Sequence, residues 1–458
     1  MQINIKHRYT RAKGYVEERV TKLLQWVEKH RMRCFWLLGI FYKLVLDYTY
    51  IFVASPSYAY AGLVLDLNAY KYLLSTLIYL LMFSLLPKKE TDAVAFLLHL
   101  QFVLTVAPML TFYALGNQNT TYMIMVCVCV VLQLLLLRGE AKPERACYIK
   151  DASSYMTVLL GIMVFATVLV TLLNNGFEGL KAFDFVYIYE MRENISYFPG
   201  FAYLLGWVTK TILPFFVLWT LQKKQYKICV ALLAIELLFF LLTGEKFLLF
   251  VILPIIGIYV LSKTKHLVKL MYTGLIIGFL VLMMVYYFMK STTLGLWIPQ
   301  LVFVRTIFHP ADNKFNFYEC FSELPKIHFS DGIIGKMFGL TYPYAGSSGQ
   351  VVYAHMGGKF LSANMNTGYL GESYAQFGFF GMLLMSLVLA FFLRALRCYD
   401  NGERFSFITA LFSVYIIILN DGALLTTLFS GGMLISLLLL MVYFKKDKEV
   451  LQNGIQRI

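Results

Sequence analysis

The sequence predicts an all-α, polytopic membrane protein with about twelve transmembrane helices, and three observations indicate this class. Of the 458 residues, 59% are hydrophobic and 14% are charged, whereas soluble domains average about 45–50% apolar and ~25% charged residues. Apolar runs of about 20 residues recur along the chain, and a helix of that length crosses ~30 Å of hydrocarbon. The basic residues between these runs are unevenly distributed. This composition excludes a soluble enzyme and a disordered chain.

Twelve apolar runs are expected to cross the membrane, and the charges between them predict the orientation. With the N-terminus inside, 28 of the 40 Lys and Arg residues fall in inside segments and 9 in outside segments. This positive-inside pattern places both termini in the cytoplasm. The net charge of +14 is therefore topological and implies no nucleic-acid partner. The expected spans are approximately 34–54, 67–86, 93–115, 120–137, 153–174, 201–221, 228–243, 247–262, 268–289, 369–393, 405–421 and 424–444.

The connections divide the chain into expected segments. Apolar and basic residues recur at helical spacing over 15–33, which is typical of an amphipathic helix on the cytoplasmic leaflet. The expected organisation is a cytoplasmic N-terminal segment at 1–33, spans one to nine at 34–289 with an outer loop at 174–200, a large extracytoplasmic loop at 290–368, spans ten to twelve at 369–444, and a cytoplasmic tail at 445–458.

The large loop at 290–368 is the expected place for chemistry. Loops this long are usually functional or disordered. This one contains many aromatic residues, enough to bury a small core of its own. A folded outer loop that faces the membrane is a natural site for a reaction on a substrate presented from outside.

The densest polar group in this loop is the run RTIFHPADNKFNFYE, from Arg305 to Glu319. Arg305 and His309 are four residues apart and share a face if the segment is helical. The planar fork of an arginine can donate two hydrogen bonds to a phosphate. A histidine titrates near neutrality and can accept a proton. The alternative is that Arg305 pairs with Asp312 or Glu319 and fixes the loop.

A second polar group closes the loop, at residues 355–381. Glu372 stands in the first turn of the expected helix, where the helix N-terminus favours a carboxylate. An acid at the edge of an apolar span is functional by default, although a helix cap or an interhelical ion pair is the alternative. His355, which two glycines follow closely, is another candidate base. The same helix is expected to present one face without bulk, formed by Gly371, Ala375 and Gly378.

Two further cations are candidates for an anion site. Lys246 lies in the turn TGEKF between two apolar runs, and Arg192 lies in the aromatic and acidic part of the first outer loop. A solvated turn and a solvated loop face are the alternatives. Lys43 and Asp47, four residues apart in the first span, are expected to pair inside the bundle. No residue spacing predicts a metal site or a nucleotide-binding loop.

With these residues identified, the chain resembles the bacterial oligosaccharide repeat-unit polymerases, the Wzy-type enzymes of O-antigen and capsule assembly. The resemblance covers the whole layout: about twelve spans, both termini inside, and two enlarged outer loops of which the later is larger. Locally, the run from Asn366 to Tyr374, followed by FGFFG at 377–381, is similar to the Asn…Leu…Gly…Gly run that ends the large loop in such polymerases and in O-antigen ligases. Met365 departs from this pattern, because ligases and many relatives have histidine there.

The resemblance implies a reaction at the outer face of the bacterial inner membrane. A growing glycan passes from an undecaprenyl-pyrophosphate carrier to the sugar of the next lipid-linked repeat unit. The family's paired outer-loop arginines, which engage the pyrophosphate, match Arg192 and Arg305, and Lys246 is expected to assist them. The implied partners are this lipid-linked oligosaccharide and membrane lipid, and the resemblance also allows a chain-length regulator as a partner. No cofactor is implied.

The general base stays open at this stage. The candidates are Glu372, His355 and His309. Three other residues are expected to position the acceptor or the loop, namely Glu319, Asn366 and Tyr374.

Three other functions are compatible with a polytopic membrane protein. A ligase would move the glycan to a different acceptor. A flippase or transporter of lipid-linked oligosaccharides would place several charges inside its spans, and few are present. A membrane O-acyltransferase would need an intramembrane histidine, for which only His99 qualifies. The length of the second outer loop favours the polymerase.

Overall fold

The computed structural model describes residues 30–139, 142–149, 152–176, 197–198, 200–264, 266–358 and 363–444. All regular elements within these ranges are helices and none is a strand. The predicted all-α class is therefore confirmed. The predicted cytoplasmic tail, nearly all of the N-terminal segment and most of the first outer loop lie outside the described residues.

Eight helical stretches are long and apolar enough to cross a membrane, so the chain is a multi-pass helical membrane protein. Several stretches join α-helices to short π-helical or 3₁₀ segments, which are labelled η. The stretches are α2 (Arg31–Thr49) with η1 (Tyr50–Ala54), α3 (Ser55–Tyr58) and η2 (Ala59–Ala61); α5 (Ala93–Gln101) with η3 (Phe102–Val106) and α6 (Ala107–Leu115); α8 (Ser153–Asn175); α10 (Phe201–Trp207) with η6 (Val208–Ile212) and α11 (Leu213–Gln222); α12 (Tyr226–Thr243); α14 (Leu267–Met289); α19 (Tyr369–Arg397); and α21 (Leu424–Leu428) with α22 (Met433–Tyr443).

Four shorter apolar helices occupy the other positions at which spans were predicted. Each predicted span therefore coincides with an apolar helix. The short helices are α4 (Ala69–Leu85), α7 (Thr120–Leu136), the Val251–Leu261 part of α13 (Lys246–Leu261), and α20 (Phe405–Leu419).

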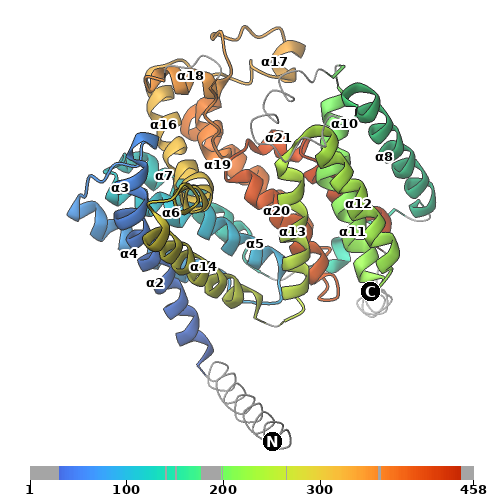
Figure 1. Cartoon of the computed structure of the whole chain (residues 1–458), viewed down its shortest axis with the longest axis horizontal. Coiled ribbons are helices and arrows are strands. Elements are labelled where there is room, and N and C mark those ends of the chain that lie inside the picture. The colour runs from blue at the N-terminus through green and yellow to red at the C-terminus, as the bar shows by residue number, and fades with distance from the viewer. Residues whose placement is uncertain are drawn as a thin grey trace, which may run out of the picture.

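The helix built from α5, η3 and α6 lies inside the bundle and is buried along its whole length. It packs against α4 and α20, and Figure 1 shows it among α2, α14 and α20. The carboxylate of Asp92 accepts a hydrogen bond from the Ala95 amide at 3.0 Å, which caps the helix where it begins. A helix that is apolar on all of its faces, as this one is, is stable only inside a packed protein core.

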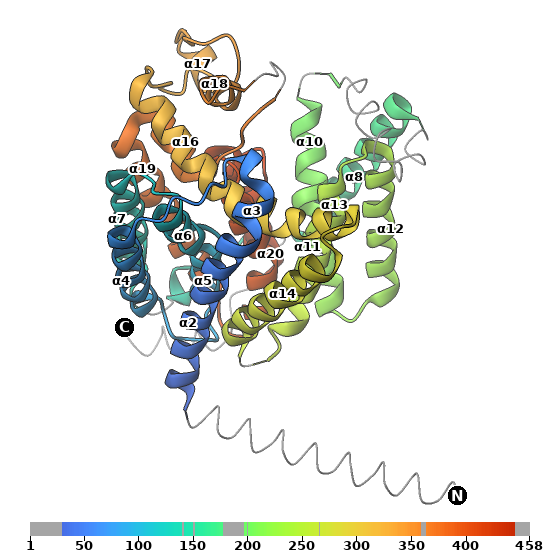
Figure 2. The same cartoon turned by 60° about the vertical axis from the view of Figure 1, so that its left-hand side comes forward.

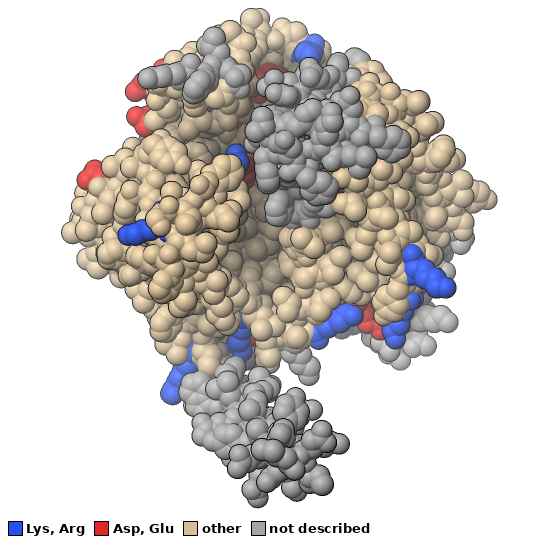
Figure 3. Space-filling view, viewed as in Figure 1, with Lys and Arg blue, Asp and Glu red and all other residues tan. Residues whose placement is uncertain are grey.

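The outer surface of the bundle is apolar. On α8 the side chains of Tyr155, Phe165 and Leu173 are 82%, 69% and 77% exposed. Soluble monomers rarely expose contiguous apolar patches larger than a few hundred Å², so this face is suited to lipid. Figure 3 shows a broad uncharged surface, with Lys and Arg gathered mainly along the lower edge of the molecule.

The stretch 290–368 is largely helical, and its first half packs into the bundle. The segments α15 (Thr293–Pro299), η7 (Gln300–Phe308) and α16 (His309–Glu323) follow one another directly, and α16 packs on α6 and α19. The short helices α17 (Ile333–Met337) and α18 (Ser348–His355) lie at the far end of α16 (Figure 2). The buried Phe303, Phe308 and Phe315 join the main core of the bundle. The prediction that aromatic residues of this loop bury a separate small core is therefore wrong for these three residues.

Helix α19 is broken near its start, at Phe377 and Gly378. Gly378 has a φ of 61°, in the left-handed region that favours glycine. The freed carbonyls of Ala375 and Gln376 accept hydrogen bonds from the backbone amides of Ile327 and His328 at 3.0 and 3.1 Å. The expectation of one continuous small-residue face through Gly378 is therefore wrong, because this glycine permits the break.

Candidate functional site

The polar residues predicted on 305–319 lie along η7 and α16. In η7 the backbone has the widened turn of a π-helix, a conformation that is frequent at functional sites. Phe303, Val304 and Phe308 are buried against the core, whereas Arg305 is exposed. The apolar residues of this segment therefore anchor it, and the guanidinium faces away from the core.

A polar cavity of about 860 Å³ lies beside α16. Its lining comes from η2, the turn between α6 and α7, η7, α16, α18 with the residues that follow it, the connection before α19, and the turn after α20. Arg305 and His309 both line it, as their four-residue spacing predicts, and so do Glu319 and Asn366. The polar lining residues are Tyr60, Gln118, Arg305, His309, Asp312, Asn313, Asn316, Glu319, Tyr353, Asn364, Asn366 and Asp421.

Arg305 is open to this cavity. Within the described part of the chain its guanidinium forms neither a hydrogen bond nor an ion pair, so the alternative pairing with Asp312 or Glu319 does not occur there. Burial raises the pKa of the Asp421 carboxyl, and the nearby positive charges of Lys314, His309 and Arg305 lower it. Arg305 is therefore available to an anionic ligand.

His309 stands next to a buried carboxylate. Its Nδ1 atom is 3.8 Å from Asp312 Oδ2, and burial raises the pKa of Asp312 while His309 lowers it. Gly62, with a φ of 87°, lies against this carboxylate, and a Cβ atom there would be 2.9 Å from Oδ2. A glycine is thus required for the chain after η2 to approach Asp312 so closely. At this distance Nδ1 forms no hydrogen bond with Asp312 and is buried without a hydrogen-bond partner among the described residues, so the carboxylate acts on the imidazole through its charge.

Lys314 fixes the turn between α20 and α21 to α16. Its side chain is fully buried, and Nζ donates to the carbonyl oxygens of Pro310 and Asn420 at 2.8 and 2.6 Å. Burial lowers the pKa of Lys314 to about 7, and the Asp421 carboxylate opposes this shift. The side chain of Asn420 also donates to the Thr306 carbonyl at 3.3 Å. These bonds hold Asp421 at the edge of the polar cavity.

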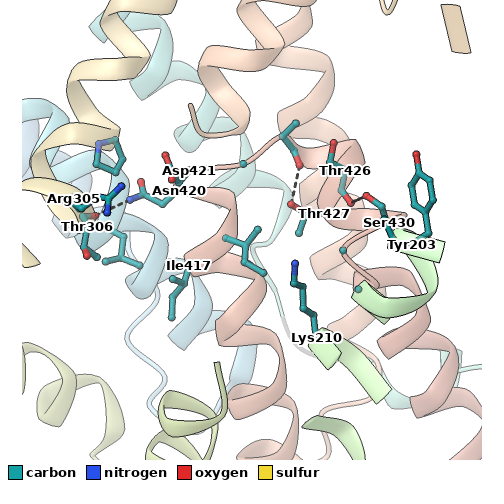
Figure 4. Close-up of a pocket in the computed structure, with 18 residues that line it drawn as sticks. Tyr203, Lys210, Arg305, Thr306, Ile417, Asn420, Asp421, Thr426, Thr427 and Ser430 are labelled. Atoms are coloured by element: carbon teal, nitrogen blue, oxygen red, sulfur yellow. Dashed lines mark hydrogen bonds between the residues drawn. The ribbon is translucent and has the colours of Figure 1, made fainter. Parts of the chain in front are cut away.

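A second cavity, the central cavity, has a volume of about 600 Å³ and lies among α10, η6, η7, α20 and α21. Figure 4 shows Arg305 and Lys210 approaching it from different sides, with Ile417 between them. Lys210 Nζ is 3.8 Å from Glu245 Oε2. Lys210 lies on η6 and Arg305 on η7, so both cations project from π-helical segments.

A third cavity, the aromatic cavity, has a volume of about 730 Å³ and contains Glu372. Gln376 Nε2 donates to Glu372 Oε1 at 2.9 Å and to Asp331 Oδ1 at 3.4 Å, and Ser348 donates to Glu372 Oε2 at 3.3 Å. Glu372 is therefore held by neutral polar groups. The aromatic lining residues are Tyr203, Trp207, Phe329 and Phe429.

The three cavities adjoin one another through shared lining residues. Arg305, Pro310 and Asp421 line both the polar and the central cavity. The central and aromatic cavities share Tyr203, Ala423, Thr426 and Ser430. The central cavity, which Arg305 and Lys210 line, thus lies between the polar cavity and the aromatic cavity.

The remaining predicted site residues are not brought together with Arg305. His355 Nε2 is 3.5 Å from Glu323 Oε2, and it lines none of the three cavities. Tyr374 is buried, with its hydroxyl 3.0 Å from Ser322 Oγ and its ring 4.0 Å from Lys326 Nζ. Both residues have structural contacts that account for them.

The side chains of two predicted cations lie outside the part of the chain that the structure describes. Arg192 falls outside the described residues, and so does the side chain of Lys246, although its backbone begins α13. Their predicted roles remain predictions.

Sequence reasoning missed several residues that the cavities bring forward. Lys210 is a lone charge inside the predicted span at 201–221, and a charge within an apolar run is itself a functional signal. Asp331 and Trp207 carry no local pattern that separates them from ordinary loop and span residues. Their role emerges only from the packing of α10, α19 and α21 around one cavity.

Searches with protein-family models, against curated proteins and against solved structures give no significant match to this chain. Among the described residues, no group of three or more His, Cys, Asp or Glu side chains is arranged to hold a metal ion. His99, the intramembrane histidine, has its ring nitrogens 2.9 Å from the Pro87 carbonyl and 3.3 Å from the Tyr272 hydroxyl.

Proposed function

We propose that the chain is an integral-membrane glycosyltransferase that polymerises undecaprenyl-pyrophosphate-linked oligosaccharide repeat units into O-antigen or capsular polysaccharide. The observation that carries the proposal is the position of Arg305, unpaired within the described residues, at the junction of the polar and central cavities. A glycosyl diphosphate bound there has its anionic group beside the guanidinium and its sugars in the polar cavity.

The diphosphate is the leaving group, and its negative charge grows as the glycosidic bond breaks. Preorganised cations lower the free energy of such a transition state. Arg305 supplies a planar fork that matches phosphate oxygens, and Lys210 supplies a second positive charge on the opposite wall of the central cavity. In this proposal both residues bind the diphosphate, together with Arg192, as the resemblance implies, and Lys246, as its position in the turn TGEKF predicts.

The acceptor hydroxyl must lose a proton as its oxygen attacks the anomeric carbon of the donor. The new C–O bond forms, the bond from the anomeric carbon to the diphosphate breaks, and His309 takes the proton. The negative charge of Asp312, 3.8 Å from His309 Nδ1, stabilises the protonated imidazole. Among the candidate bases, His309 is favoured because it lines the same cavity as Arg305, whereas Glu372 lines the aromatic cavity and His355 faces Glu323.

The proposed topology has twelve spans, both termini in the cytoplasm of a bacterial cell, and the cavities at the outer face of the inner membrane. The apolar helices at all twelve predicted positions support the span count. The charge distribution supports the orientation, because Lys and Arg gather along one edge of the molecule (Figure 3) and α16 and α18 extend to the other end (Figure 2).

Reconstitution with lipid-linked repeat units tests this function. Purified full-length protein in proteoliposomes, supplied with units from the organism that encodes it and with no nucleotide, should yield a ladder of longer lipid-linked glycans. Transfer of single units to another lipid or polymer acceptor would instead assign a ligase. Movement of intact units across the bilayer without any new glycosidic bond would assign a flippase, and both results would refute the polymerase.

A further inference from the structure

We infer that the aromatic cavity is a saccharide subsite that binds the acceptor glycan and discriminates against uronic acids. The name acceptor rests on the proposed function, whereas the saccharide chemistry follows from the lining of the cavity. The cavity, at about 730 Å³, is within the size range of small-molecule sites in proteins.

Two carboxylates supply the polar wall. Glu372 and Asp331 accept hydrogen bonds from the same amide nitrogen, Gln376 Nε2, so they lie side by side. A carboxylate only accepts hydrogen bonds and has about four acceptor positions. Hydroxyl and ammonium groups of a sugar donate to such oxygens, whereas a sugar carboxylate has no proton to donate and is repelled by negative charge on this wall. Neutral and amino-substituted sugars therefore fit this wall.

Four aromatic side chains supply the apolar wall. Tyr203 and Phe429 are 43% and 62% exposed, which leaves their faces open to a ligand. Trp207 is held in place because its indole N–H donates to the Phe429 carbonyl at 2.9 Å. Aromatic faces beside a few fixed polar groups suit a pyranose ring, which has an apolar C–H face and a polar rim.

The backbone beside the cavity is held in a rare conformation. His328 and Phe329 have φ values of 55° and 58°, which residues with bulky side chains seldom adopt. The Phe329 amide donates to Gln376 Oε1 at 2.6 Å, and the preceding amides bind the open carbonyls at the break in α19. The same Gln376 thus positions Phe329 on one side and both carboxylates on the other. Strain that the surroundings maintain in this way is typical of ligand sites.

The subsite also lies where an acceptor is needed. It adjoins the central cavity through Tyr203, Ala423, Thr426 and Ser430, and Arg305 lines the opposite part of that cavity. A glycan anchored by Glu372 and Asp331 can therefore extend its terminal sugar toward the diphosphate of the donor.

Glycan binding by the full-length protein in nanodiscs tests the inference without any turnover. An array of neutral, amino-substituted and uronic-acid oligosaccharides, none carrying a lipid, should give binding to neutral or amino-substituted members and about tenfold or more weaker binding to uronic acids. On the best binder, Asp331→Asn should weaken affinity about tenfold or more and reduce the discrimination against uronic acids. Trp207→Ala should weaken it about fivefold or more.

Matched controls separate the subsite from the rest of the molecule. Phe391→Ala and Phe165→Ala, at exposed aromatic residues on α19 and α8 that line none of the three cavities, should leave glycan affinity within about twofold. Absence of binding to every oligosaccharide, or unchanged affinity in both cavity variants, overturns the inference. If polymerase activity is absent while the Asp331- and Trp207-dependent binding persists, the proposed function fails and the saccharide site stands. If the ladder forms and the variants bind normally, only the subsite fails.

Discussion

The two ends of the helical bundle hold their charged residues in different ways. Where α19 finishes and α5 begins, the charges are buried in pairs: Arg397 Nη2 is 2.6 Å from Asp92 Oδ2. Nearby elements repeat the pattern, with Lys269 Nζ at 3.2 Å from Glu90 Oε1. At the other end, Arg305 and His309 face a cavity of about 860 Å³.

The difference indicates which charges serve the fold and which serve a ligand. A buried charge without a partner costs several kcal/mol, so buried pairs persist where they join helices. Arg397 does this directly, because its guanidinium also donates to the carbonyls of Leu137 and Gly139 at the end of α7. An exposed arginine at the junction of two cavities has no such structural partner among the described residues. Removing it should therefore affect binding and leave stability unchanged.

The largest loss of activity is expected for His309→Gln. Removing a general base typically costs about 10²–10⁴ in rate, and glutamine keeps a polar side chain in the cavity. The measurement is the initial rate of ladder formation in proteoliposomes. His355→Gln is the matched control, because that imidazole faces the exposed Glu323 at 3.5 Å, and its rate should stay within about twofold of the parent. A normal rate for His309→Gln with a large loss for His355→Gln would reverse the assignment.

The largest loss of stability is expected at the end of the bundle where the charged residues are buried in pairs. Arg397→Met leaves the buried Asp92 carboxylate without its cation, which should lower the free energy of unfolding by about 3–5 kcal/mol. Thermal unfolding in detergent measures this as a large fall in Tm. Arg394→Met, on the same helix but exposed, should change stability by less than about 0.5 kcal/mol. Equal effects of the two substitutions would show that the buried pair contributes nothing to the fold.

Arg305→Ala should show the opposite profile. Loss of one preorganised contact to a developing anion typically costs about 10²–10³ in rate, whereas the Tm should remain that of the parent because the side chain is exposed. Arg305→Lys should recover part of the rate, since it keeps the charge but not the fork. A parent-like ladder from Arg305→Ala would remove this residue from the site, and a large fall in Tm would make it structural.

The positions of the helices could be predicted from the sequence because a membrane imposes one physical requirement on length and polarity. Each predicted span coincides with an apolar helix for this reason. The pairing of Lys43 with Asp47 is confirmed by a 2.5 Å contact, since residues four apart in a helix are neighbours. The shared cavity of Arg305 and His309 depends on the same local rule.

The cavities themselves could not be predicted, because residues far apart in the chain form them. Asp421, Asp331 and Lys210 meet the predicted residues only after α10, α19 and α20 have packed. The break at Gly378 depends on amides near residue 327, about fifty residues earlier. Small residues at helical spacing favour close packing just as well as a break, so the local pattern could not distinguish the two.

Lys314 provides the most specific test, because it is a buried charge at the open end of the molecule. Burial lowers its pKa in the folded protein to about 7, whereas an unfolded lysine titrates near 10.4. Between these values the unfolded state binds more protons, so stability should rise with pH by up to about 1.4 kcal/mol per unit from pH 7 to 10. Below pH 7 both states are protonated and this contribution stops changing.

The pH dependence of Tm in detergent measures this effect, and the slope is the relevant quantity. Lys314→Met loses hydrogen bonds to Pro310 and Asn420, so its Tm should be lower at every pH. Its rise between pH 7 and 10 should nevertheless be smaller than that of the parent. Lys336→Met, at an exposed lysine on α17, should keep the parental slope. If Lys314→Met also keeps the parental slope, the proton responsible belongs to another group. Lys314 would then be charged in the folded protein from pH 7 to 10, because its hydrogen bonds to the two carbonyls offset the cost of burial.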